Sequence, residues 1–89
     1  MLEKKLALHN KLGLHARAAS KLVSIASRYS SDIYILYDNK QVNSKSIMKV
    51  LTLGAPSGAE LTIHTNGTDE NDAMRALTHL IQEKFGEAE

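Results

Sequence analysis

The sequence predicts an α/β fold of the α+β kind, a layered sandwich with one face of its sheet open to water. Strand-like and helix-like hydrophobic periods alternate in the order β-α-β-β-α-β-α along 89 residues. The strands are too few and too widely spaced for a parallel wound sheet, which favours a four-stranded mixed or antiparallel sheet under two longer helices. Residues 1–89 are long enough for one compact domain and too short for two.

Composition limits the setting in which the chain works. It contains no cysteine, so disulfides and thiolate metal sites are excluded, and this usage is compatible with a reducing cytosol. No apolar run approaches the roughly 18 residues of a membrane span, and the N-terminus lacks an apolar signal region. These features predict a soluble cytoplasmic protein without membrane insertion.

Charge is distributed unevenly, although the net charge is only +1. Residues 1–50 hold nine Lys and Arg against three acids, a balance of +6, whereas residues 51–89 hold two against seven, a balance of −5. The basic half suits an acidic or phosphorylated partner, and the alternative is an ordinary dipolar surface.

The first strand and the first helix follow from two different periods. Leu2, Leu6 and Leu8 alternate with mostly polar residues, which predicts a strand. A loop at 10–14 then leads to a helix from about Ala16 to Tyr29. Its apolar stripe comprises Ala18, Ala19, Leu22, Val23, Ile25, Ala26 and Tyr29.

A hairpin and a short helix come next. Residues 33–43 alternate as two strands around a tight turn at 38–40. The stretch 44–53 is expected to contain a short helix, with Ser46 as the better N-cap and Gly54 as its C′ residue. We expect its inner face to comprise Ile47, Val50 and Leu51.

A fourth strand and a last helix complete the order. Leu61 and Ile63 alternate with polar residues within 60–65, after breaks at Pro56 and Gly58. A cap and acids at the start of the last helix complement its dipole, and they are Thr68, Asp69, Glu70 and Asp72. The buried stripe of this helix comprises Met74, Leu77, Leu80, Ile81 and Phe85.

One stretch departs from plain fold-building, namely Gly13-Leu14-His15-Ala16-Arg17. A helix usually begins at Ser, Thr, Asp or Asn, whose oxygen accepts the first amides, and a histidine fills that position poorly. An arginine in the first turn is also disfavoured by the helix dipole. Both departures predict an anion-binding site. The alternative is a loop histidine before a helix that starts at Ser20.

That stretch is followed by Asn43-Ser44-Lys45-Ser46-Ile47-Met48 and by Leu53-Gly54. Together these motifs resemble the HPr family of histidine-containing phosphocarriers in the bacterial phosphoenolpyruvate-dependent phosphotransferase system, and the resemblance covers nearly the whole chain. It implies an HPr-like open-faced β-sandwich, βαββαβα, with a four-stranded antiparallel sheet covered on one face by helices. It also implies that His15 accepts a phosphoryl group from enzyme I and passes it to enzyme IIA proteins for sugar uptake and regulation. Such a carrier is a phosphoryl-transfer intermediate rather than a stand-alone catalyst.

The residues make this chemistry plausible. The helix dipole and Arg17 both disfavour an imidazolium ion, which keeps His15 a neutral nucleophile. The amides of Ala16, Arg17 and Ala18 suit a bound phosphoryl group, and neither a metal nor another cofactor is required. The family usually places proline directly after the arginine, whereas this chain has Ala18. We therefore expect altered transfer rates but no loss of function.

Ser46 is a second candidate site. A serine at this point is a good N-cap in any case, which is the structural alternative. The resemblance adds regulatory phosphorylation by an HPr kinase/phosphorylase. Because the helix dipole tolerates a phosphate here, the modification is expected to repel an acidic partner without unfolding the helix.

The resemblance also implies one docking face for donor and acceptors, formed by the short helix and the exposed edge of the first. Its candidate residues are Ser20, Lys21, Ser24, Lys45, Ile47, Met48 and Lys49. Ile47 and Met48 are adjacent, so a short helix cannot bury both, and a single exposed methionine would be unremarkable. A carrier that docks successive partners through one face is best served by being a monomer.

Other site classes find little support. His9, His64 and His79 have no metal-ligand spacing, so we interpret them as structural or surface residues and expect no metal. The basic half lacks interleaved aromatics, so no nucleic-acid binding is expected. Two alternatives stay open: a regulatory or nitrogen-type relative acting by phosphorylation-dependent binding, and a binding module that kept the fold and lost the relay.

Overall fold

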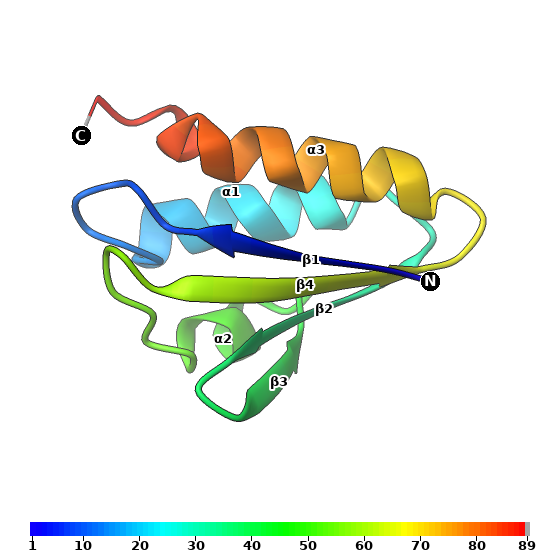
Figure 1. Ribbon diagram of the computed structural model, residues 1–89, viewed down its shortest axis with the longest axis horizontal. Helices are drawn as coiled ribbons and strands as arrows, with labels where there is room; N and C mark the ends of the chain where they lie inside the picture. Colours follow the sequence, from blue (N-terminus) through cyan, green and yellow to red (C-terminus); the bar gives the residue numbers. More distant parts are fainter. Residues whose placement is uncertain (89) are drawn as a thin grey trace.

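The chain folds in the order that its hydrophobic periods predict. The structure, a computed structural model, describes residues 1–88. Its elements are β1 (Leu2–Ala7), α1 (Ala16–Ala26), β2 (Asp32–Tyr37), β3 (Lys40–Asn43), α2 (Ile47–Leu51), β4 (Glu60–Asn66) and α3 (Glu70–Gln82). A 3₁₀ turn, η1 (Lys84–Gly86), follows α3 (Figure 1). The predicted βαββαβα order is therefore confirmed.

The four strands form one antiparallel sheet in the order β1-β4-β2-β3. Ile63 of β4 lies opposite Lys4 of β1 and Ile35 of β2, so the central strand is paired on both sides. The strands β2 and β3 form a hairpin through Asp38 and Asn39, whose positive φ angles of 51° and 65° are those of a two-residue hairpin turn. The sheet is thus antiparallel throughout.

The core lies on one face of the sheet, beneath α1 and α3, which lie side by side in Figure 1. Alternate strand residues point into it, as a period of two requires. Its fully buried members include Leu8, Ala18, Ala19, Leu22, Ile33, Ile35, Val50, Leu61, Ile63, Leu77, Ile81 and Phe85. The opposite face carries polar side chains such as Glu3 and His64, whose Oε1 and Nε2 atoms are 3.1 Å apart. One face is apolar and covered, and the other is open.

The loop before α1 is held rigidly against the loop after α2. Gly13 has φ +64°, and a Cβ there would lie 2.6 Å from the carbonyl oxygen of Ala55. The amide of Leu14 donates to the same oxygen at 2.9 Å. The buried Asn10 closes the loop from inside, since its Nδ2 donates to the carbonyl of Gly13 at 2.7 Å. These contacts fix the direction in which α1 begins.

The predicted end of the first helix was wrong. The helix α1 ends at Ala26, not near Tyr29. Beyond its end, the amides of Ser30 and Ser31 donate hydrogen bonds to the carboxylate of Asp69, the N-cap residue of α3, instead of continuing the helix. Asp69 is therefore the N-cap of α3 by position only, and its side chain makes no cap bond. The hydroxyl of Ser31 and these amides lower its pKa from 3.8 to about 2.

Three predictions near the short helix and the C-terminus also need correction, and they concern the burial of Ile47, the cap position of Gly54 and the element that contains Phe85. Ile47 is 38% exposed, so the inner face of α2 consists of Val50 and the partly buried Leu51. The C-cap residue of α2 is Thr52, so Gly54, with φ +60°, lies two residues beyond the C-cap and is not the C′ residue. Phe85 is buried as expected, but it lies in η1, outside α3.

Candidate functional site

His15 is the N-cap residue of α1, as the sequence predicts. Its backbone is extended, with φ −79° and ψ 177°, and its side chain makes no cap hydrogen bond. The first bond within the helix runs from the amide of Ala19 to the carbonyl of His15 at 2.8 Å. The amides of Ala16, Arg17 and Ala18 therefore have no acceptor among residues 1–88. Three unpaired amides at a helix start form an anion-binding arrangement.

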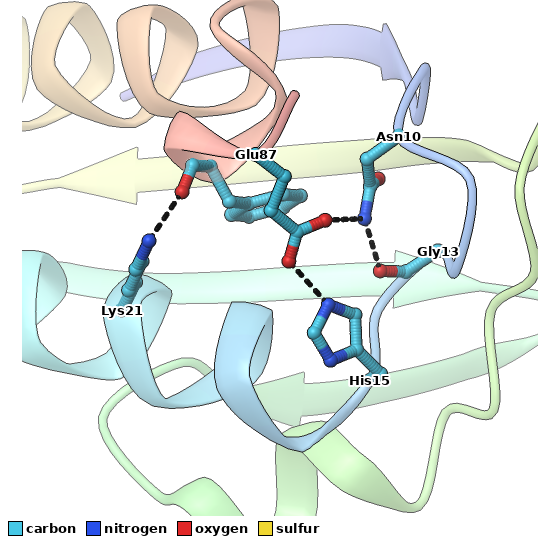
Figure 2. A network of polar contacts seen from close by, with 6 residues as sticks. Asn10, Gly13, His15, Lys21 and Glu87 are labelled. Carbon is cyan, nitrogen blue, oxygen red and sulfur yellow. Dashed lines mark hydrogen bonds and ion pairs between the residues drawn. The ribbon is translucent and has the colours of Figure 1, made fainter. Parts of the chain in front are cut away.

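The imidazole ring of His15 is held at one nitrogen and open at the other. Its Nε2 contacts Oε2 of Glu87, and the side chain is 25% exposed. Figure 2 shows the second ring nitrogen, Nδ1, on the side facing away from Glu87. This nitrogen has no hydrogen-bond partner in the part of the chain that the structure describes.

Glu87 is a site residue that the sequence reasoning missed. It follows η1 and reaches His15 across 72 positions of sequence, so no local pattern places the two together. Burial opposes ionisation of its carboxyl group, but hydrogen bonds from Asn10 and His15 outweigh this and lower the pKa of Glu87. The only sequence signal was a glutamate just beyond the predicted end of the last helix.

A cavity of about 500 Å³ opens beside the ring. Its lining residues are Lys11, Leu12, His15, Ala16, Arg17 and Glu87. Arg17 is exposed and lies on the same turn of α1 as the unpaired amides. Two cationic side chains and a helix start thus surround one side of the histidine, which makes the cavity suitable for an anion.

Ser46 is the N-cap of α2, as predicted. Its Oγ accepts a hydrogen bond from the amide of Lys49 at 3.4 Å, and its side chain is partly buried. The short helix contacts α1, so Ser46 and His15 begin two neighbouring helices. The structure therefore gives unmodified Ser46 a capping role.

The predicted docking residues differ in how available they are. Ser20, Ser24 and Lys49 are exposed, and Met48 is 72% exposed. Leu12, which the sequence reasoning missed, is 66% exposed beside His15. These side chains and Ile47 are accessible on α1, on α2 and on the loop that precedes α1.

Two lysines of the predicted docking face are committed to internal contacts. Lys21 donates from Nζ to the carbonyl of Phe85 at 2.6 Å, and Lys45 donates to the carbonyl of Tyr29 at 2.7 Å. Both are only partly exposed. Lys21 therefore fastens α1 to the turn η1, and Lys45 fastens the turn before α2 to the segment that follows α1.

Metal binding and membrane spanning find no structural support within residues 1–88. No group of three His, Asp or Glu side chains there is arranged to hold a metal ion. The helices of this region lack the length and hydropathy to cross a bilayer.

Comparison with known proteins identifies the family. The family model described as the PTS HPr component phosphorylation site matches residues 2–83. Phosphocarrier protein HPr of Neisseria meningitidis is 45% identical over 89 residues, which is 100% of both chains. The crystal structure of HPr-C-His from Thermoanaerobacter tengcongensis is 45% identical, covers 100% of each chain and has a TM-score of 0.96. An HPr dimer from the same organism is 46% identical, covers 98% of this chain and 100% of that one, and has a TM-score of 0.79. The chain belongs to the HPr family of phosphocarrier proteins of the phosphotransferase system.

Proposed function

We propose that His15 accepts a phosphoryl group from phosphorylated enzyme I, which is charged by phosphoenolpyruvate, and passes it to enzyme IIA proteins for sugar uptake and regulation. The observation that carries this proposal is the position of His15 at an uncapped helix start, beside a cavity whose lining includes Lys11 and Arg17. Family membership implies partners of the phosphotransferase system.

The nucleophile is Nδ1, because Nε2 is engaged by Glu87. Its lone pair forms the new N–P bond as the bond from phosphorus to the donor breaks, and the bonding electrons stay with the donor. The amides of Ala16, Arg17 and Ala18 and the guanidinium of Arg17 stabilise the charge on the phosphoryl oxygens. Each exposed charge near a helix start contributes about 0.3–1 kcal/mol, so the group is held weakly enough to be passed on.

Docking uses the exposed surface around Leu12, Ser20, Ser24, Met48 and Lys49. An apolar patch with basic neighbours complements an acidic rim on a partner. Phosphorylation of Ser46 by a kinase would add negative charge to the edge of this surface and weaken such docking.

A relay that docks each partner through one face works best as a monomer, and we propose this state in the cytoplasm, where phosphoenolpyruvate is produced. An HPr from Thermoanaerobacter tengcongensis has been crystallised as a dimer, so the state of this chain is a separate measurement. Light scattering across a range of concentrations provides it. A dimer at the concentrations used for phosphoryl transfer would contradict the monomer proposal.

The decisive experiment is incubation with enzyme I and phosphoenolpyruvate, followed by intact mass and phosphorus NMR. We expect one acid-labile phosphoryl group on the wild type and on His79→Ala, which alters an exposed histidine of α3. We expect none on His15→Ala. Failure to phosphorylate a folded wild type, with an enzyme I that is active on another carrier, would overturn the proposal.

A further inference from the structure

The carboxylate of Glu87 uses both of its oxygens next to the reactive histidine. Oε1 accepts a hydrogen bond from Nδ2 of Asn10 at 2.9 Å, and Oε2 contacts Nε2 of His15 (Figure 2). The Glu87 side chain is only 15% exposed. Glu87 therefore occupies a defined position between the loop that precedes α1 and the ring at its start.

The chain delivers Glu87 to this position through an unusual turn. Lys84, Phe85 and Gly86 have positive φ angles of 55°, 57° and 77° in succession, a conformation that side chains other than glycine rarely adopt. The buried Phe85 ring anchors the turn in the core, and Lys21 Nζ holds the carbonyl of the same residue at 2.6 Å. The turn is stabilised from both sides, which is expected of a segment with a specific placement.

Asn10 connects Glu87 to the backbone that positions His15. Its side chain is fully buried, and its Nδ2 donates both to the carbonyl of Gly13 and to Glu87. A single amide group thus fixes the loop that leads into α1 and the carboxylate that faces the ring. Glu87 and His15 are held relative to the same backbone.

We propose that Glu87, supported by Asn10, is a positioning residue that keeps the proton of neutral His15 on Nε2 and leaves the lone pair of Nδ1 available for phosphoryl transfer. An ionised carboxylate only accepts hydrogen bonds, so the ring nitrogen that faces it must carry the hydrogen. The same contact orients Nδ1 away from Glu87. This inference rests on the proposed function of His15.

The contact also matters after transfer. When Nδ1 forms its bond to phosphorus, the proton stays on Nε2 and the ring acquires positive charge. The carboxylate of Glu87 then faces a cation, which strengthens the hydrogen bond between them. It offsets the helix dipole and Arg17, both of which disfavour positive charge on the ring. Glu87 thus favours the phosphorylated ring relative to the free one.

The test compares substitutions at Glu87 that place either a hydrogen-bond donor or no hydrogen-bonding group opposite Nε2 of His15. Glu87→Gln keeps one acceptor oxygen, which Asn10 engages, and places an NH₂ donor opposite Nε2. The proton of the ring should then move to Nδ1, and the rate of phosphorylation should fall about tenfold. Glu87→Ala offers no donor, so its rate should fall less than that of Glu87→Gln. The matched control is Glu83→Gln, the same charge change on an exposed residue one turn earlier, which should change neither quantity.

Two readouts separate this inference from the proposed function. Nitrogen-15 NMR of the unphosphorylated protein reports which ring nitrogen carries the proton, without any donor present. Phosphorylation by enzyme I reports the transfer rate. A wild type that is phosphorylated while Glu87→Gln alters neither the protonated nitrogen nor the rate overturns the role of Glu87 alone. A folded wild type that is never phosphorylated overturns the proposed function, and the role of Glu87 in transfer with it.

Discussion

The starts of α1 and α2 present the same backbone problem and solve it in opposite ways. At α2 the Oγ of Ser46 accepts the amide of Lys49, so the helix caps itself. At α1 His15 has a similarly extended backbone, but its side chain makes no cap bond and contacts Glu87 instead. At the start of α1, the side chain of the N-cap residue contacts a carboxylate that is distant in sequence, and the first amides of the helix stay unpaired. An uncapped helix start costs stability locally, and at α1 it leaves backbone donors available to an incoming anion beside His15.

The largest effect is expected when α1 is given the cap that α2 has. In His15→Ser, the serine oxygen can accept the amide of Ala18, but no imidazole remains to carry a phosphoryl group. We expect complete loss of acid-labile phosphorylation by mass spectrometry. The free energy of unfolding should change by less than about 1 kcal/mol, because the new cap offsets the lost contact with Glu87. An acid-labile phosphate on this variant would contradict the assignment of His15.

A second change breaks the rigid approach to α1. In Gly13→Ala, the added Cβ would meet the backbone of Ala55, Pro56 and Ser57 at 2.6–2.7 Å in a left-handed conformation. We expect a loss of about 3 kcal/mol in urea denaturation, from strain and overpacking together. Gly54→Ala is the matched control, because Gly54 has φ +60° with no atom within 4 Å of its Cβ. It should lose about 1 kcal/mol, and equal losses would show that the close approach is unimportant.

The third change removes the cap of α2. Ser46→Ala should lower the free energy of unfolding by about 1 kcal/mol, because the amide of Lys49 loses its acceptor. Phosphorylation of His15 by enzyme I should continue, since Ser46 does not contact the ring. Urea denaturation and the phosphorylation assay measure the two effects separately. Loss of phosphorylation with the fold intact would mean that the two helix starts are coupled.

The start of α3 differs from both, because its N-cap residue Asp69 accepts hydrogen bonds from Ser30 and Ser31 and makes no cap bond. This contact is expected to have a smaller effect on stability, one that depends on pH. Asp69 has its pKa lowered from 3.8 to about 2 by hydrogen bonds from Ser31 and Ser30. Its contribution to stability is therefore complete above about pH 4 and is lost as the pH falls toward 2. We expect thermal unfolding of Asp69→Asn to depend less on pH between 4 and 2 than that of the wild type. Parallel pH profiles for both proteins would contradict this.

The sequence was sufficient for the scaffold because the scaffold rests on short-range patterns. Alternation in Leu61 and Ile63 predicted β4, and the motif around His15 predicted the start of α1, both from residues a few positions apart. The roles of Glu87 and Asn10 were not predicted, because their contact spans 77 positions of sequence and depends on the turn at Phe85. Only the tertiary fold brings them together.

Two further differences have the same origin. The exposure of Ile47 depends on α2 being only five residues long, so that Val50 alone is fully buried in it. The early end of α1 depends on Asp69, which lies 38 and 39 positions away from the serines that it binds. Periodicity describes each helix separately, and it does not report contacts made at the helix ends.

The internal contacts of Lys21 and Lys45 have a consequence for chemical modification. Both amino groups are held on backbone carbonyls, whereas Lys49 is exposed on α2. Amine-reactive reagents should therefore label Lys49 before the other two, as peptide mass mapping can measure. Acetylation of Lys49 would remove a positive charge from the proposed docking surface without breaking a contact between segments. Acetylation of Lys21 or Lys45 would remove the ammonium group that bonds a backbone carbonyl of a neighbouring segment. For Lys21, the lost bond is the one to Phe85, so the turn that holds Glu87 against His15 would be less firmly held.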